Sequence, residues 1–186
     1  MKYFWLIVGL CGILGGCKPE VKPKPKGFLA LSFPPPHYRT LAHCQYAFKV
    51  NTITRAVQPF DERPCFLNIE YPQLKGTIYL TYEPVEGNLK ELLEDAQKLP
   101  LKHTIKADEI IGDQYENVAH HTYGMLYTVT GDAASQAQFY LTDSTAHFLT
   151  GSVYFERRPD YDSLYPAAMY LKEDVKVMME SLEWEP

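Results

Sequence analysis

Three consecutive segments in the second half of the chain alternate apolar and polar residues and are separated only by short turns. They are residues 123–130, 136–142 and 147–155. Their apolar rows are Met125, Tyr127 and Val129, then Ala137, Phe139 and Leu141, then Leu149, Val153 and Phe155. Since side chains alternate between the two faces of a strand, Gln136, Gln138 and Tyr140 should point outward. Three adjacent strands with one apolar face predict an antiparallel meander that packs against another element.

The first half of the chain shows the same alternation of apolar and polar residues. Residues 44–50, 66–71 and 77–83 form strand candidates, and Pro72 ends the second of them. The apolar rows of the first and third candidates are Tyr46, Phe48 and Val50, and Ile78, Leu80 and Tyr82. Together with the meander, these segments predict a sheet of about six strands.

Two segments have helical spacing. One apolar face carries Leu89, Leu92, Leu93, Ala96 and Leu99, and Asn88 with Glu91 resembles a capping box at its start. Pro100 should kink or end this helix, although the helical pattern is compatible with a resumption through residues 102–110.

The second helix should be capped by Asp162 or Ser163. Its apolar stripe consists of Leu164, Ala167, Ala168, Leu171, Val175, Met178 and Leu182. The order of elements predicts an α+β domain, in which an antiparallel sheet of about six strands packs with two helices. That order is similar to the Mog1/PsbP-like sandwich, a likeness of fold that assigns no function.

The N-terminal segment indicates where the protein is processed. Lys2 precedes an apolar stretch, residues 4–14, which is short for a bilayer span, and Gly15 and Gly16 lead into Cys17. This pattern resembles a bacterial lipobox, so we expect cleavage after Gly16 and lipidation of Cys17. The predicted organisation is a signal peptide over residues 1–16, a lipidated Lys/Pro-rich tether over 17–36 and a single globular domain over 37–186. The alternative is a buried cysteine that happens to follow two glycines.

Charge is distributed unevenly along the chain. The whole sequence has a net charge of -5, whereas residues 18–26 carry +3, with Lys-Pro repeats that favour extended polyproline II. An acidic domain argues against a nucleic-acid partner. The tether lysines are suited either to anionic head groups or to a solubilising spacer. Lys18 stands where inner-membrane lipoproteins often have Asp, which favours an outer-membrane location facing the periplasm.

Two cysteines remain after the signal peptide and Cys17 are set aside. In an oxidising periplasm Cys44 and Cys65 are expected to pair as a disulfide. The alternatives are two buried free thiols or, less favoured, a metal site, because no Cys-x-x-Cys spacing accompanies them.

A search for catalytic patterns is negative. The sequence has no Gly-x-Ser-x-Gly, His-Glu-x-x-His, P-loop or Rossmann glycine motif. Asp143, Ser144 and His147 are close in sequence, but Asp and Ser at a tight turn usually bond their own backbone. His120 and His121 are adjacent before a strand, where neighbouring side chains diverge and do not share a metal. We therefore predict no enzyme activity, no metal and no cofactor.

Several long segments are similar to one known family. They are residues 23–27, 68–72, 102–108, 123–127, 131–155, 162–166 and 183–184. In order and in composition they resemble the gliding-motility lipoprotein family GldD of Bacteroidota, over nearly all of the chain after Cys17. The resemblance implies a cell-envelope lipoprotein required for gliding motility and type IX protein secretion. It brings no catalytic residue.

Binding is therefore the predicted mode of action, as a non-catalytic assembly or stabilising subunit among other envelope lipoproteins. Two polar segments in an apolar framework are candidates for the contact surface. Their residues are Lys102, His103, Lys106 and Asp108, and Asp143, Ser144 and His147. The alternatives are an envelope hydrolase acting through Ser144 and His147, and a periplasmic glycan-binding module using exposed tyrosines such as Tyr79 and Tyr140.

Overall fold

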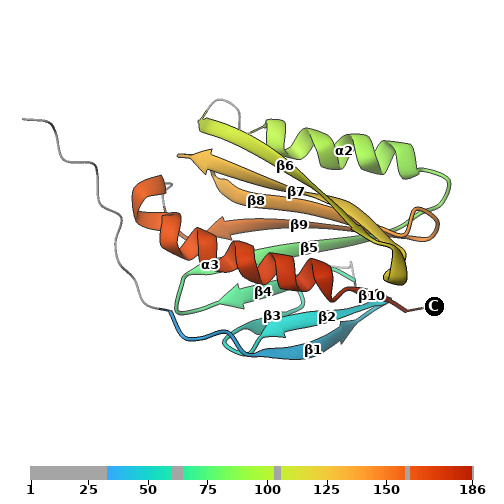
Figure 1. The fold of residues 1–186 in the computed structure, drawn as a ribbon, viewed down its shortest axis with the longest axis horizontal. Coiled ribbons are helices and arrows are strands. Elements are labelled where there is room, and N and C mark those ends of the chain that lie inside the picture. Colours follow the sequence, from blue (N-terminus) through green and yellow to red (C-terminus); the bar gives the residue numbers. More distant parts are fainter. Residues whose placement is uncertain (1–32, 60–64, 103–105, 158–159, 186) are drawn as a thin grey trace, which may run out of the picture.

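Two antiparallel sheets and two helices make up the fold of the computed structural model, which describes residues 33–59, 65–102, 106–157 and 160–185 (Figure 1). The larger sheet has the order β3-β4-β5-β9-β8-β7-β6. Its strands are β3 (Arg55–Val57), β4 (Leu67–Tyr71), β5 (Gly76–Pro84), β6 (Ala107–Asn117), β7 (Thr122–Gly131), β8 (Ser135–Thr142) and β9 (His147–Phe155). The smaller sheet has the order β1-β2-β10, formed by β1 (Tyr38–His43), β2 (Tyr46–Asn51) and β10 (Glu183–Trp184).

The helices cover opposite faces of the larger sheet. Helix α3 (Tyr161–Glu180) packs in the main core, which includes Phe139 and Leu141 of β8. Helix α2 (Leu89–Leu101) packs against Tyr140, which points to the other face of the same strand. Because side chains of a strand alternate, one strand supplies both cores. The predicted α+β class is confirmed, whereas the similarity to a Mog1/PsbP-like sandwich stays a prediction.

Most of the main core forms from the residues that the alternation and the helical spacing selected, but the expected row of β7 is wrong in its face. Met125 and Tyr127 pack on the α2 side with Tyr140, and Leu126 lies in the main core instead. Its members include the rows Tyr46, Phe48 and Val50 and Ile78, Leu80 and Tyr82, together with Leu171, Val175 and Met178 of α3. Leu182 is also in this core, but it follows the end of α3 and does not belong to the helix as expected. The helical stripe lies on one face because positions three and four residues apart are neighbours on a helix. The smaller sheet and α3 thus pack on and cover one face of the larger sheet.

The second face of β8 was expected to point outward to solvent, but in the structure it is buried. Gln136, Gln138 and Tyr140 are all buried, and the Tyr140 ring stacks on Phe148 with 5.8 Å between centroids. Helix α2 covers this face, so β8 is buried over its whole length. Tyr140 is consequently unable to act as the exposed sugar-stacking residue that we had considered.

Residues 107–117 form strand β6, so the possible resumption of a helix through residues 102–110 is wrong. Helix α2 instead ends at Leu101, directly after Pro100, in agreement with the expected effect of the proline. Strands β1, β3 and β10 were not predicted. They are short or largely exposed, which leaves little alternation to detect.

Both predicted helix caps are replaced by other contacts. Asn88 precedes α2 without a side-chain cap, and its Oδ1 accepts a hydrogen bond from the Glu86 amide. Helix α3 begins at Tyr161, ahead of Asp162 and Ser163, and the Tyr161 amide donates to Asp132 Oδ1 at 2.9 Å. The orphan amide at the start of α3 is therefore satisfied by the β7–β8 turn rather than by the helix's own residues.

The disulfide is confirmed. Cys44, in the turn between β1 and β2, is bonded to Cys65, just before β4, with 5.6 Å between the Cα atoms. It joins the smaller sheet to the larger one. Among the residues that the structure describes, neither helix combines the length and the apolar character needed to cross a bilayer.

Candidate functional site

An open pocket of about 430 Å³ lies at the end of the molecule where the chain finishes. It is formed by η1 (Val118–His120), the β8–β9 turn and β10. Its lining residues are Ala119, His120, His121, Asp143, His147, Glu183, Trp184 and Glu185. We refer to this hollow as the His147 pocket. It combines imidazoles, carboxylates and one indole, a set suited to polar recognition.

Asp143 organises the turn that borders the pocket. Its Oδ1 accepts hydrogen bonds from the amides of Thr145, Ala146 and His147 at 2.8–3.0 Å, and its Oδ2 accepts from the Thr145 hydroxyl at 2.7 Å. Burial raises the pKa of Asp143, but the hydrogen bonds from His147 and its neighbours outweigh that effect and hold the pKa at about 2. The carboxylate is thus fixed in its ionised form by its own turn.

His147 is held on two sides. Its Nδ1 lies 2.8 Å from the Tyr82 hydroxyl, which itself donates to Gln45 Oε1. Because the tyrosine proton is directed to Gln45, the Tyr82 oxygen can accept a hydrogen bond from Nδ1 of His147 in the tautomer that carries its proton there. The Trp184 indole stacks on the imidazole. Burial raises the pKa of Tyr82, and the nearby charge of Asp143 raises it further. The Tyr82 hydroxyl therefore keeps its proton and remains neutral.

The candidate nucleophilic set is not assembled. Among the described residues, no hydrogen bond joins the Ser144 hydroxyl to His147, and the Asp143 carboxylate bonds the turn rather than the imidazole. Ser144 itself has φ of +68°, and its amide donates to the Thr142 hydroxyl. A hydrolase needs a nucleophile, a base and an orienting group in contact, and this geometry gives that alternative no support.

The two neighbouring histidines also have separate surroundings. His120 lies in η1, with its Nδ1 4.0 Å from Glu183 Oε1, and His121 follows with φ of +48°. Within the described part of the chain, no three His, Cys, Asp or Glu side chains converge as metal ligands. The chemistry that the pocket offers is hydrogen bonding, ion pairing and stacking.

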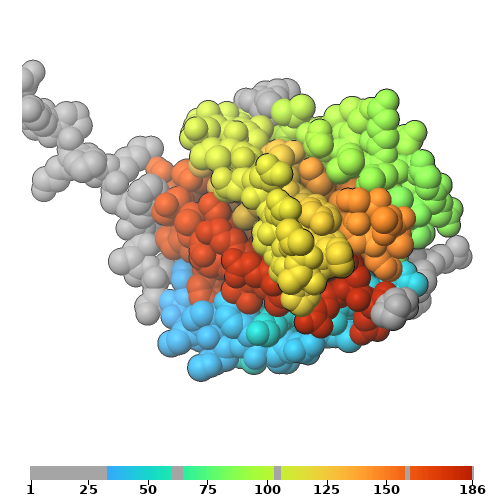
Figure 2. All heavy atoms as spheres, turned by 45° about the vertical axis from the view of Figure 1, so that its right-hand side comes forward, coloured from blue at the N-terminus to red at the C-terminus, as the bar shows by residue number. Residues whose placement is uncertain are grey.

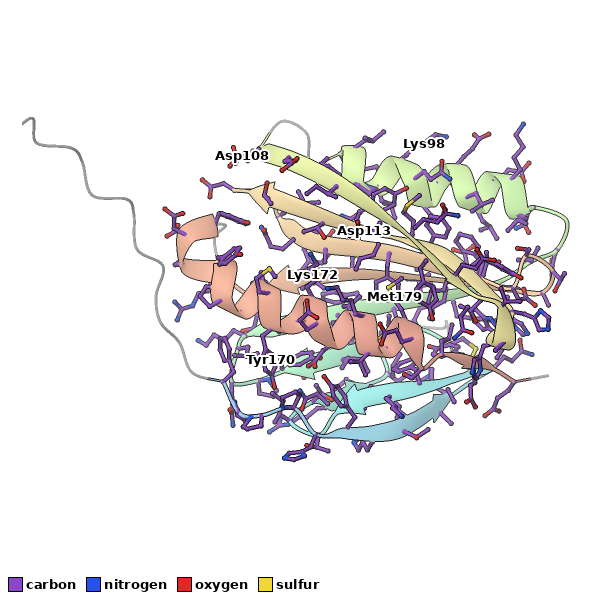
Figure 3. The ribbon with its side chains drawn as sticks, in the orientation of Figure 1. Lys98, Asp108, Asp113, Tyr170, Lys172 and Met179 are labelled. Atoms are coloured by element: carbon purple, nitrogen blue, oxygen red, sulfur yellow. A yellow bond between two sulfur atoms is a disulfide. The ribbon has the colours of Figure 1, made fainter. Side chains whose placement is uncertain are left out.

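The other residues proposed for the contact surface lie elsewhere. Lys102 follows α2, and Lys106 and Asp108 flank the start of β6; all three are exposed. This is the opposite end of the sheet from the His147 pocket, as the label of Asp108 in Figure 3 shows. His103 lies outside the described residues. The structure thus separates the predicted surface into two regions.

Sequence reasoning missed a buried carboxylate. Asp174 of α3 is only 3% exposed and accepts hydrogen bonds from Tyr38, Asn51 and Tyr71 at 2.7–2.9 Å. Burial and the nearby Asp174 charge raise the pKa of Tyr71. An acidic residue among Leu171, Val175 and Met178 was the available signal, since a charge on an apolar helix face needs partners. We refer to Asp174 and its three donors as the Asp174 cluster, which joins α3 to both sheets.

The described chain begins at the other end from the His147 pocket. The Phe33 ring lies 5.0 Å from the ring of Tyr170 on α3, and the Tyr170 hydroxyl donates to the Pro34 carbonyl at 3.2 Å. Figure 3 places Tyr170 on the side where the chain enters, away from the chain end that borders the pocket. The point of entry and the pocket are therefore at opposite ends of the domain.

These features define an α+β domain with a pocket lined by imidazoles, carboxylates and an indole at the end remote from Phe33, where the described chain begins. The sequence pattern of the family described as Gliding motility lipoprotein GldD matches residues 18–184. The chain belongs to this family of gliding motility lipoproteins, as its segments indicated. A search of curated proteins finds no match.

Proposed function

We propose that this GldD-family chain is a non-catalytic assembly or stabilising subunit of the gliding and type IX secretion machinery. The observation that carries the proposal is the position of the His147 pocket. It opens at the far end of the domain from Phe33, where the tether arrives, so a partner would meet it on the side turned away from the membrane. Family membership supports a role at the cell envelope.

Lipidation of Cys17 is the first element of this proposal. Acyl chains on one residue supply about 0.8 kcal/mol for each buried CH₂, so two or more chains anchor a protein stably. The anchor would hold the chain in the outer membrane, facing the periplasm. Cys17→Ala should abolish palmitate incorporation and release the protein from the membrane fraction, whereas Cys11→Ala should do neither. Palmitate on the Cys17→Ala chain would contradict the proposal.

Partner contact through the His147 pocket is the second element. A photocrosslinking residue at exposed Ser144 should capture another lipoprotein of the motility and secretion machinery in living cells. The same group at Lys98, an exposed position on α2, is the matched control. Glu183→Lys with Glu185→Lys should reduce surface spreading and secretion while the domain stays folded. Equal capture from both positions would contradict a specific contact here.

A glycan-binding module is a second candidate, supported by one exposed aromatic pair. Tyr79 of β5 and Tyr154 of β9 are 46% and 37% exposed and pack edge to face, with 5.8 Å between centroids. Exposed aromatic faces can stack on sugar rings. Calorimetric titration with peptidoglycan fragments should give heat that Tyr79→Ala removes. Absence of heat with the unaltered protein would reject this candidate.

A further inference from the structure

Strand β6 is the edge of the seven-stranded sheet, and that edge is open. Ten of its eleven residues pair with β7 on one side, and Asp108 lies in an irregularity of the register. Within the described ranges, no backbone hydrogen bond links β6 to any element on its other side. In an antiparallel strand every second residue directs its N–H and C=O to the same side, so a row of unpaired groups faces solvent. The space-filling view shows this strand at the surface (Figure 2).

One face of β6 presents a regular pattern of side chains. Glu109, Ile111 and Asp113 alternate along the strand and stand opposite Thr130, Thr128 and Leu126. Ile111 is 43% exposed, and both carboxylates are exposed as well. Alternate residues in a strand are about 6.8 Å apart. The open edge therefore offers an apolar side chain between two acidic ones at strand spacing.

The strand has no positive charge of its own. Asp108 and Glu116 add two further carboxylates, and residues 107–117 contain no Lys, Arg or His. None of the four acids forms an ion pair with another residue that the structure describes. Their charges remain available to an incoming basic segment.

A second copy of the same strand does not suit this edge. Antiparallel self-pairing centred on Gly112 would set Asp108 opposite Glu116, and a shift by one residue would set Glu109 opposite Glu116. Like charges directly opposite each other destabilise a strand pair. Acidic side chains are also a known means by which edge strands avoid each other. The charge pattern thus selects against a homodimer through β6.

The chain's own basic tether is a poor occupant for a different reason. Residues 18–26 contain Pro19, Pro23 and Pro25. Proline has no N–H to donate, so such a segment leaves several of the ladder's hydrogen bonds unmade.

We propose that the β6 edge binds an extended segment of a partner protein as an added antiparallel strand. The partner segment carries basic, apolar and basic side chains at alternate positions. Its backbone pairs with β6, its two basic side chains meet Glu109 and Asp113, and its apolar side chain covers Ile111. This surface is distinct from the His147 pocket and extends the proposed assembly role by naming the chemistry of a partner.

Hydrogen exchange provides a direct test. The full-length protein in detergent is mixed with the peptide acetyl-Thr-Lys-Thr-Val-Thr-Lys-Thr-amide, and exchange of the β6 amides is followed by mass spectrometry. We expect the peptide to slow exchange in β6. The double variant E109K/D113K should bind it about tenfold more weakly, because two attractive charge pairs are lost. The matched variant E91K/D95K changes the same charge on α2 and should bind as the unaltered protein does.

Four outcomes overturn the proposal. In the first, the peptide does not slow β6 exchange at any concentration, and in the second, a peptide with Glu in place of Lys binds equally well. In the third, β6 exchange slows as the protein concentration rises without peptide, and in the fourth, β6 exchange becomes faster when residues 18–26 are deleted. The third outcome assigns the edge to a second copy, and the fourth assigns it to the tether. A failed peptide test leaves the crosslinking result at Ser144 unaffected, so the two proposals are tested separately.

Discussion

The imidazole ring of His147 lies parallel to the indole ring of Trp184, with 5.1 Å between centroids and 7° between ring planes. His147 begins β9 of the larger sheet, and Trp184 belongs to β10 of the smaller one, where it pairs with Tyr46. This stack therefore fixes the C-terminal strand against the larger sheet and forms one wall of the His147 pocket.

Trp184→Ala should remove the stack and detach β10. We expect a loss of about 2 kcal/mol in the free energy of unfolding, because a half-buried aromatic side chain is deleted. Trp184→Phe keeps an aromatic ring and should lose less than half of that amount. Urea unfolding followed by circular dichroism measures both. An unchanged midpoint for Trp184→Ala would show that the stack does not hold the C-terminal strand.

Asp174→Ala should be the most damaging of the substitutions in α3. Removal of the carboxylate leaves the donors of Tyr38, Asn51 and Tyr71 without this acceptor in the core, at a cost of about 3 kcal/mol. Tyr38→Phe removes a single donor from the rim of the cluster and should cost about 1 kcal/mol. Chemical denaturation provides the comparison. Equal losses in the two variants would contradict a central role for Asp174.

The disulfide should stabilise the domain measurably. Cys44 and Cys65 are 21 residues apart, for which the chain-entropy description gives about 3 kcal/mol. The double variant Cys44→Ser/Cys65→Ser should lose that amount, and dithiothreitol should lower the unaltered protein to the same stability. Dithiothreitol should have no effect on the double variant, which serves as the control. Free thiols at both positions in the untreated protein, found by mass spectrometry, would refute the pairing.

Asp143 should contribute a pH-dependent part of the stability. Its pKa lies at about 2 in the folded protein and near 3.8 in an unfolded chain. The contribution is therefore complete above about pH 4 and is lost as the pH falls toward 2. Asp143→Asn should lower Tm at pH 7, and its difference from the unaltered protein should shrink toward pH 2. Asp95→Asn, at an exposed position on α2, is the control. A Tm difference for Asp143→Asn that is constant over this pH range would contradict the assignment.

Local periodicity was a reliable guide where one face of a strand or helix meets the main core. The rows Tyr46, Phe48 and Val50 and Ile78, Leu80 and Tyr82 lie where alternation predicted. It failed for residues 107–117, because the exposed edge strand β6 has few buried side chains and hence almost no alternation. It failed also on the second face of β8, since burial there is created by α2 and not by the strand's own pattern.

The candidate site was predictable only in part. Asp143 and Ser144 were recognised as turn residues, and the hydrogen bonds of Asp143 to its own turn are of the expected kind. The contributions of His120, Glu183 and Trp184 to the pocket were not foreseen, because these residues come from segments that meet only in the folded chain. The hydrogen-bond donors to Asp174 could not be predicted for the same reason, since Tyr38 is 136 residues away in sequence.

The sequence by itself determined the α+β class, the main strands, the core stripe of α3, the cysteine pair and the family. These follow from patterns within a few residues of each other, from the count of cysteines and from segments long enough to be specific. Only the tertiary structure decided that β8 is buried on both faces, that β6 is an open acidic edge and that Asp174 is satisfied in the core. Such features depend on which distant segments meet, and the energy of a buried charge or an unpaired strand edge is set by those neighbours.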